Sequence, residues 1–248
     1  MIQILGISGM PLVKPGDSIA DQIVEAAKTA SIQIQASDII VVAQKIVSKA
    51  EGNVLDLSTV QPSSLAETIA KTSGKDPRHV EVILRESACI VRMRGAHLIV
   101  ETPHGFVCAN AGVDRSNVGA NNSVVLLPVD PDKSAKRIRD RIKKLTGANV
   151  GVIVSDTFGR AWRNGQVNVA IGVAGLSPVI DYRGTSDMFG NQLCVTQIAI
   201  ADELSSAAEL VMRKSDRIPV AIIRGVTYVT DDGSIKPLIR PKEEDLFR

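Results

Sequence analysis

Apolar residues occur along this chain both in short runs and in helical stripes, and the two patterns predict different elements. Residues 2–7 and 38–43 are mostly apolar runs with the length and β-branched content of buried strands. Between them, Asp17 has the side chain of a helix N-cap. The residues that follow repeat at helical spacing and predict one buried helix face, made of Ile19, Ile23, Ala26 and Ala27. The chain therefore opens as strand, loop, helix and strand.

The middle of the chain continues this alternation. Asp76 and Pro77 are a cap and a first-turn proline between two helical patterns. A later helix has Asp132 as its predicted cap and ends at Gly147. The predicted elements are, in order, helices over 63–72 and 78–87, a hairpin of 97–101 with 105–109, a strand over 123–127 and a helix over 133–146.

The last hundred residues carry more strand patterns than helical ones. The predicted strands are 167–173, 178–182, 193–200 and 220–223, with a helix over 202–212. Strands and helices mix too irregularly for a pure Rossmann or TIM order. We therefore predict an α/β fold of mixed sheets with flanking helices. It forms a single module over 1–248, with a smaller lobe at about 158–200.

The segment 151–172 carries the strongest chemical signal. Its apolar run over 152–154 predicts a buried strand that stops at Ser155 and is followed by Asp156 and Thr157. A carboxylate at the carboxyl end of a buried strand lies where open α/β sheets bind ligands. The oxygens of Asp156 and Thr157 suit Mg²⁺ or Mn²⁺. The alternative is an ordinary turn, since Asp and Gly are common turn residues.

Basic side chains accompany two of the predicted strand ends. Arg160 and Arg163 offer forked donors suited to phosphate or carboxylate groups. Lys45 and Lys49 follow the strand over 38–43 and share a face if the chain turns helical there. That pair can close over a triphosphate, or it can be two solvated lysines on an amphipathic segment.

Two loops complete the candidate site. The loop over 110–119 holds Asp114, a second carboxylate for a metal near Asp156, and Asn117, an amide for a base, sugar or phosphate. Taken alone, it is an Asx-rich loop. The loop over 8–16 joins a strand to a helix and can wrap a nucleotide, although the sequence has neither a GxxxxGK[ST] nor a GxGxxG motif.

Composition narrows the partners. The chain has 248 residues, 44% of them apolar, and a net charge of +2, so no global field attracts nucleic acid or an anionic membrane. Only 3% of residues are aromatic, which disfavours base stacking. The sequence has no membrane-spanning apolar run and no basic leader, so we expect a cytoplasmic protein. Three cysteines without zinc-site spacing are interpreted as small buried hydrophobes.

Several separate motifs together resemble one family, the coenzyme F420-0:L-glutamate ligases, also called F420-0 γ-glutamyl ligases. The matching segments cover nearly the whole chain, and their order and spacing are specific. They are GMPL at 9–12, SKAEG at 48–52, NAGVDRSNV at 110–118, SDTFGRAWRNGQ at 155–166, DYRG at 181–184 and ADELSSAAELVM at 201–212.

The resemblance implies an activity and a set of partners. Members of the family attach L-glutamate to the lactyl carboxylate of F420-0, and some add further γ-linked glutamates. The reaction uses GTP and Mn²⁺ or Mg²⁺, with two divalent ions expected and K⁺ as a further cation. The implied fold is α/β, unlike ATP-grasp or Mur ligases, and forms an intertwined homodimer.

The resemblance also assigns residues to these roles. Asp114, Asp156 and Thr157 are implied as metal ligands, and Asp156 and Asp114 as the catalytic centre. Arg160 and Arg163 are candidates to grip the acyl phosphate or the incoming glutamate. The implied GTP-binding residues are Met10, Pro11, Leu12, Val13, Gln44, Lys45, Lys49, Asn117, Met212, Arg213, Lys214, Ser215, Asp216, Arg217 and Ile218.

The sequence departs from the family pattern at one place. Many relatives have glycine after the residue that matches Met212 and again before Ile218, where this chain has Arg213 and Arg217. One metal ligand expected in this segment is not evident. Two other functions therefore stay open: a nucleotide-binding module without ligase activity, and a metal-dependent phosphohydrolase that uses the same aspartates.

Overall fold

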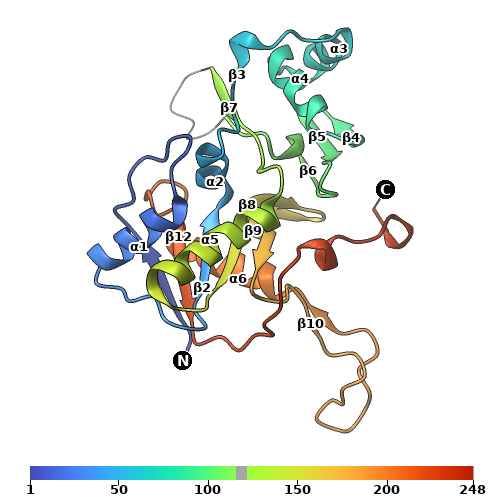
Figure 1. Cartoon of the computed structure of the whole chain (residues 1–248). Coiled ribbons are helices and arrows are strands. Elements are labelled where there is room, and N and C mark those ends of the chain that lie inside the picture. The colour runs from blue at the N-terminus through green and yellow to red at the C-terminus, as the bar shows by residue number, and fades with distance from the viewer. Residues whose placement is uncertain (116–121, 248) are drawn as a thin grey trace.

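A mixed sheet of five strands forms the centre of the molecule in the computed structural model, which describes residues 1–115 and 122–247 (Figure 1). Only β2 and β8 pair in parallel, and the other neighbours are antiparallel. The strands across the sheet are β1 (Gln3–Ile7), β12 (Val220–Arg224), β2 (Ile39–Ala43), β8 (Gly151–Arg160) and β9 (Arg163–Ala174).

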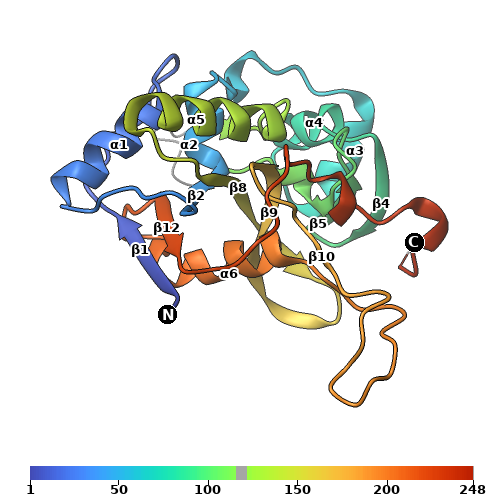
Figure 2. The same ribbon diagram turned by 60° about the horizontal axis from the view of Figure 1, so that its bottom comes forward.

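Helices cover both faces of this sheet, as Figure 2 shows. One face carries α1 (Ile19–Thr29), α2 (Gln44–Ala50) and α5 (Pro131–Thr146), and the other carries α6 (Ile200–Met212). Covered strands must be apolar on both sides. The central strands meet this requirement with wholly buried side chains at positions 39–42, 152–154 and 220–222. We refer to the sheet and these four helices as the body.

A second, smaller core lies in the described residues between 54 and 126, which we refer to as the lobe. Short strands and two amphipathic helices enclose it, and the lobe stands at the top of the view in Figure 1. Its elements are β3 (Val54–Asp56), α3 (Ser64–Ser73), α4 (Pro77–Arg85), β4 (Cys89–Arg94), β5 (His97–Glu101), β6 (Val107–Ala109) and β7 (Ser123–Val125).

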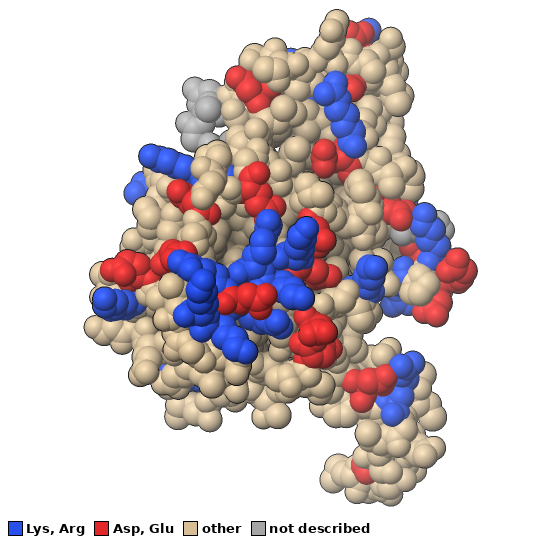
Figure 3. All heavy atoms as spheres, viewed as in Figure 1, with Lys and Arg blue, Asp and Glu red and all other residues tan. Residues whose placement is uncertain are grey.

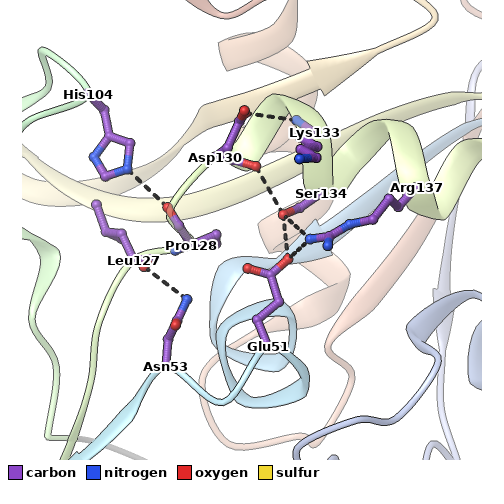
Figure 4. A network of polar contacts seen from close by, with 9 residues as sticks. All are labelled: Glu51, Asn53, His104, Leu127, Pro128, Asp130, Lys133, Ser134 and Arg137. Atoms are coloured by element: carbon purple, nitrogen blue, oxygen red, sulfur yellow. Dashed lines mark hydrogen bonds and ion pairs between the residues drawn. The ribbon is translucent and has the colours of Figure 1, made fainter.

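The chain leaves the body at Asn53 and returns to it at Leu127, and polar contacts tie these two crossings together. Asn53 Nδ2 donates to the Leu127 carbonyl at 3.4 Å, and the Leu126 amide donates to the Asn53 carbonyl at 3.0 Å. Beside them, Glu51 at the end of α2 accepts from Ser134 and Arg137 of α5 (Figure 4). The lobe is thus an insertion whose two ends lie side by side.

Two segments project from the body. The β8–β9 hairpin extends beyond the sheet to a tip at 161–162. The segment over 182–196 forms an arm between β10 (Ile180–Asp181) and β11 (Gln197–Ile198), seen at the lower right of Figure 1. Large apolar side chains are exposed on both: Trp162, Met188, Phe189 and Val195. The carboxyl-terminal residues include two short 3₁₀ turns, Lys236–Leu238 and Lys242–Glu244.

The α/β class predicted from the sequence is confirmed, as are most of its elements. Asp76 caps α4 with Pro77 in the first turn, and Gly147 ends α5 in the left-handed conformation. The described lobe adopts the predicted helices and hairpin. The single module over 1–248 stays a prediction, as does the smaller unit predicted at about 158–200, which is a different segment from the lobe defined above. Asn117 lies outside the described residues.

Several local predictions were wrong. Ser18, not Asp17, caps α1, because its hydroxyl accepts from the Asp21 amide. Asp130, not Asp132, caps α5, since Pro131 takes the first helical position. The Asp132 carboxylate instead accepts from the amides of Val173 and Ile235.

The predicted end of the strand at Ser155 was also wrong, because β8 continues to Arg160 by pairing with β9 alone. Of the strand predicted over 193–200, only Gln197–Ile198 is extended in a sheet. Cys108 is buried as predicted, but Cys89 and Cys194 are exposed. Across residues 1–115 and 122–247, no helix has the length and apolar character that crossing a bilayer requires.

Candidate active site

Asp156 lies where β8 passes the end of its neighbour β2. The last parallel pair joins Ala43 to Ser155, and the pairing with β9 shifts register between Val154 and Ser155. Such a break in the ladder can re-aim a side chain at the sheet edge. Asp156 is therefore the first residue of β8 that has no pairing partner on β2.

Burial raises the pKa of the Asp156 carboxyl to about 6. The charge of Asp114 adds to this rise. The Thr157 amide and the ammonium groups of Lys45 and Lys214 act in the opposite direction. The carboxylate of Asp114, the ammonium groups of Lys45 and Lys214 and the amide of Thr157 therefore all lie near the Asp156 carboxylate.

Asp114 reaches this site from the lobe. Its amide donates to the Val125 carbonyl at 3.0 Å and its carbonyl accepts from the Val125 amide at 2.8 Å. The preceding turn has positive φ at Asn110, Ala111 and Gly112, an uncommon conformation for the first two. The carboxylate forms an ion pair with Lys45 Nζ at 2.7 Å, which links the lobe to α2 of the body.

The two lysines of α2 lie one helical turn apart, as their spacing predicts. Burial lowers the pKa of Lys49, and the charge of Lys45 lowers it further. Gln44 begins this helix and is buried, with its Oε1 accepting from Ser48 Oγ at 2.9 Å. Its Nε2 finds no acceptor among the described residues, nor does the buried Ser155 hydroxyl find a partner there. Unpaired buried polar atoms at a strand edge are typical of ligand sites.

A closed ring of polar contacts forms the other side of the site. Thr157 Oγ1 donates to Asn168 Oδ1 at 2.7 Å, and Asn168 Nδ2 donates to Glu209 Oε2 at 2.9 Å. Lys214 Nζ donates to Thr157 Oγ1 and lies 3.7 Å from Glu209 Oε1. The ring joins β8, β9, α6 and the segment that follows α6.

The sequence reasoning missed Asn168 and Glu209. Asn168 is a buried polar residue inside the apolar run of β9, and that contrast was its available signal. Glu209 occurs within the ADELSSAAELVM motif, one turn before the end of α6, where an acidic group is unfavourable to the helix dipole. An acid in that position indicates a partner elsewhere.

The two predicted nucleotide-binding loops reach the same edge of the sheet. Ile7 at the end of β1 pairs with Val220 at the start of β12, and the Ala43 amide donates to the Pro219 carbonyl at 2.9 Å. The segments over 10–13 and 212–218 therefore both leave the sheet beside the start of α2. Met10 and Val13 pack on the main core, Leu12 is exposed, and residues 213–217 are exposed.

Arg160 and Arg163 lie apart from this group. They pair with each other at the exposed tip of the β8–β9 hairpin, and Arg160 donates to the Asn164 carbonyl at 2.7 Å. Four residues of extended strand separate the Cα atoms of Asp156 and Arg160 by about 13 Å. Their proposed grip on substrate stays a prediction.

The donor set determines which metal the site fits. Within the described part of the chain, no three His, Cys, Asp or Glu side chains gather as a metal cage. Two half-buried carboxylates that act on each other match the way Mg²⁺ and Mn²⁺ bind with water and substrate phosphates completing the shell. The residues therefore fit a hard divalent ion shared with a phosphate-bearing substrate.

A basic surface lies away from this site. Figure 3 shows Lys and Arg gathered over α5, with acidic side chains among them. Arg137 pairs with Glu51, Arg141 with Asp21 and Arg139 with Asp140. Because these three arginines have acidic partners, this part of the surface is a solvated helix face.

Comparisons with known proteins agree with the motifs. The family described as F420-0:Gamma-glutamyl ligase matches residues 8–225. A relative named coenzyme F420:L-glutamate ligase from Methanothermobacter thermautotrophicus is 48% identical over 100% of this chain and 99% of its own. Relatives of the same name from Methanocaldococcus jannaschii and Archaeoglobus fulgidus are 46% and 38% identical, over 100% of this chain and 97% and 96% of theirs.

Proposed function

The chain belongs to the F420-0:gamma-glutamyl ligase family, and we propose that it joins L-glutamate to the lactyl carboxylate of coenzyme F420-0 at the expense of GTP. The single observation that carries the proposal is the pairing of carboxylates from two regions, Asp156 from the body and Asp114 from the lobe, with lysines beside them. That arrangement suits phosphoryl transfer, which needs charge neutralisation and positioning.

The first step activates the carboxylate. A carboxylate oxygen of F420-0 attacks the γ-phosphorus of GTP, the bond from that phosphorus to the β–γ bridging oxygen breaks, and GDP leaves. The product is an acyl phosphate, whose leaving group is phosphate rather than oxide. This step concentrates negative charge, and the ammonium groups of Lys45 and Lys49 on one face of α2 would offset it.

The second step forms the amide. The amine nitrogen of glutamate attacks the acyl carbon, the carbon–oxygen bond to phosphate breaks, and the departing phosphate takes up the proton that the nitrogen loses. The protein's part is to hold the two reactants in line and to exclude water from the acyl phosphate. The same two steps add further γ-linked glutamates when the acceptor carboxylate is that of a glutamate already attached.

Asp114 and Asp156 would hold the divalent ion, Mn²⁺ or Mg²⁺. When bound, such an ion neutralises developing charge on the transferred phosphoryl group. The raised pKa of Asp156 is the mark of a carboxylate that gains from a cationic partner, since burial penalises its negative charge. K⁺ as a further cation is also part of the proposal and rests on the family resemblance.

The GTP pocket would be formed where three segments leave one edge of the sheet: residues 10–13, the start of α2 and residues 212–218. Two features support this placement: the amide nitrogen of Gln44 has no acceptor among the residues that the structure describes, and Lys49 is partly buried. Both features favour a ligand that supplies acceptor oxygens.

A homodimer is the assembly we propose. The exposed Trp162 at the hairpin tip, together with Met188 and Phe189 on the arm, offers apolar surface on the two projecting segments. Arg160 and Arg163 share that hairpin tip, and we propose that a dimer brings them to the substrate of the partner subunit. Light scattering on the eluting peak of a sizing column tests the mass.

Mass spectrometry of F420-0 incubated with the protein, GTP, Mn²⁺ and L-glutamate tests the function. Ligation adds the mass of one or more glutamate residues and releases GDP and phosphate together. A phosphohydrolase releases phosphate or GDP without any added mass. A nucleotide-binding module gives neither product, and either of these two results would overturn the proposal.

A further inference from the structure

The ammonium group of Lys214 occupies a position among oxygen ligands that a metal ion would otherwise fill. Its Nζ donates to Thr157 Oγ1, lies 3.7 Å from Glu209 Oε1 and acts on the charge of Asp156. A hydroxyl and two carboxylates around one cation are the usual surroundings of a hard divalent ion.

The hydroxyl group of Thr157 both donates one hydrogen bond and accepts another. Thr157 Oγ1 donates its proton to Asn168 Oδ1, with 2.7 Å between the two oxygen atoms. Toward its other side the Thr157 oxygen can therefore only accept. Lys214 donates to that side. A divalent ion on Thr157 Oγ1 would have to displace the ammonium group or bind the second lone pair beside it, where the two cations repel each other.

The backbone around Lys214 holds the ammonium group in this position at a cost. Arg213 ends α6 with φ 48° and ψ 174°, and Arg217 has φ 57°. Side chains other than glycine rarely adopt such angles, and strained residues of this kind cluster at functional sites. The two strained residues flank the segment and turn Lys214 back toward β8.

From these contacts we propose that Lys214 is a fixed cation of the site and takes the place of a second divalent ion. The chain then works with one exchangeable metal, held by Asp114 and Asp156, and with the Lys214 ammonium group on the Thr157 side. The inference rests on the proposed function, because it assigns the charge that would face the nucleotide's terminal phosphate.

Glu209 and Asn168 are positioning residues in this arrangement. Glu209 has one oxygen near Lys214 and the other bound to Asn168, so it fixes both members of the ring. Neither residue has to contact the substrate. Their effect is to hold the ammonium group on Thr157, although the side chain of Lys214 is 63% exposed.

Counting bound Mn²⁺ tests the inference directly. Electron paramagnetic resonance measures the free ion during a titration of the intact chain in the presence of a non-hydrolysable GTP analogue. We expect one Mn²⁺ per wild-type chain, one per chain for Lys214→Arg, and two for Lys214→Gln, which removes the charge and leaves an oxygen donor. Lys71→Gln, an exposed lysine of α3, is the matched control and should bind one.

Two Mn²⁺ per wild-type chain, or an unchanged count in a folded Lys214→Gln variant, would overturn the inference. Circular dichroism checks the fold, and Lys214→Asn, which also removes the charge and keeps an oxygen donor, replaces Lys214→Gln where the latter does not fold. The ligation assay separates the two proposals. If the wild-type chain adds glutamate and binds two Mn²⁺, the inference about Lys214 is wrong and the proposed function stands. If it binds one Mn²⁺ but adds no glutamate, the fixed cation is supported and the proposed function is wrong.

Discussion

The body and the lobe each supply one carboxylate to the candidate site, but they hold it by different means. Asp156 extends from a strand whose preceding residues, 152–154, are wholly buried between two helical layers. Asp114 follows a turn of three residues with positive φ in a lobe whose strands are short. The lobe strand β4 is exposed at nearly every position.

This difference indicates which half of the site is rigid. A strand in the middle of a covered sheet opens only with the whole core, whereas short strands with exposed faces open at lower free energy. The body therefore fixes the position of Asp156, and the lobe brings Asp114 to it. The ion pair of Asp114 with Lys45 and the contacts at the crossings hold the two halves together.

The largest expected effect comes from removing either carboxylate. Asp156→Asn and Asp114→Asn should each lower the ligation rate about a thousandfold, because several kcal/mol of charge stabilisation depend on a shared metal. The double variant should be little worse than either single one, since both act through the same ion. Mass spectrometry of the glutamylated product measures all three rates.

The half-buried residue Asp187 of the arm, which lies outside the candidate site, provides the control for this comparison. Asp187→Asn should keep the wild-type rate, and circular dichroism should show the same fold for every variant. If Asp114→Asn keeps the wild-type rate at saturating Mn²⁺ while Asp156→Asn does not, the lobe contributes no metal ligand and the shared site is disproved.

A core substitution in each region comes next. Ile83 of α4 and Ile40 of β2 are both wholly buried, so Ile83→Ala and Ile40→Ala should each cost about 3 kcal/mol of unfolding free energy. Amide hydrogen exchange should separate them. Ile83→Ala should reduce protection in the lobe alone, and Ile40→Ala should reduce it throughout. Equal loss in β2 and β8 for both variants would mean that body and lobe unfold as one unit.

A smaller effect is expected at the crossings. Glu51→Gln removes the charge that accepts from Ser134 and Arg137, as drawn in Figure 4, and hydrogen bonds to charged groups contribute about 2 kcal/mol. We expect a loss of about 1 kcal/mol in chemical denaturation, since Gln keeps one acceptor. Glu25→Gln on the exposed face of α1 is the control and should leave stability within experimental error.

The smallest effect concerns acid stability of the lobe. Burial lowers the pKa of His79, with Lys75 and Arg115 adding to the shift, and its ring hydrogen-bonds the backbone of Val113 beside Asp114. Below a pH of about 6.5 the His79 ring binds a proton in the unfolded chain but stays neutral in the folded chain until its lowered pKa is reached. Unfolding free energy should therefore fall with decreasing pH, by at most about 1.4 kcal/mol per pH unit from this group.

Denaturation at a series of pH values measures that slope. His79→Asn should lack this part of it, and His97→Asn, which changes an exposed histidine, should keep it. Identical slopes for the wild-type chain and His79→Asn would contradict the assignment, because the folded and unfolded states would then bind protons at position 79 equally.

The sequence predicted the parts of the fold that local chemistry determines. Apolar runs identified the buried strands of the body, and Asp76 with Pro77 marked the start of α4. The extension of β8 to Arg160 was missed, because residues 155–160 are not apolar and become a strand only by pairing with β9. β4 was missed for a similar reason, since an exposed strand has no buried side to show in the pattern.

The site was predictable residue by residue but not as an assembly. Asp156, Asp114 and Lys45 stood out as carboxylates and a cation after strands, and the structure brings their charges together. Nothing in the local sequence pairs Thr157 with Lys214, or Asn168 with Glu209, because those contacts depend on how α6 packs on β9. Long-range packing of this kind is not visible to periodicity.

The adjoining ends of the lobe have a consequence for how such proteins diversify. Since the chain departs at Asn53 and re-enters at Leu127, with the Leu126 amide bonded to the Asn53 carbonyl, the intervening residues form a cassette with neighbouring junctions. Exchanging that cassette for one from a distant homologue leaves the strand order of the central sheet untouched. Such an exchange also replaces Asp114, so a new cassette must bring its own carboxylate to the place beside Lys45 and Asp156.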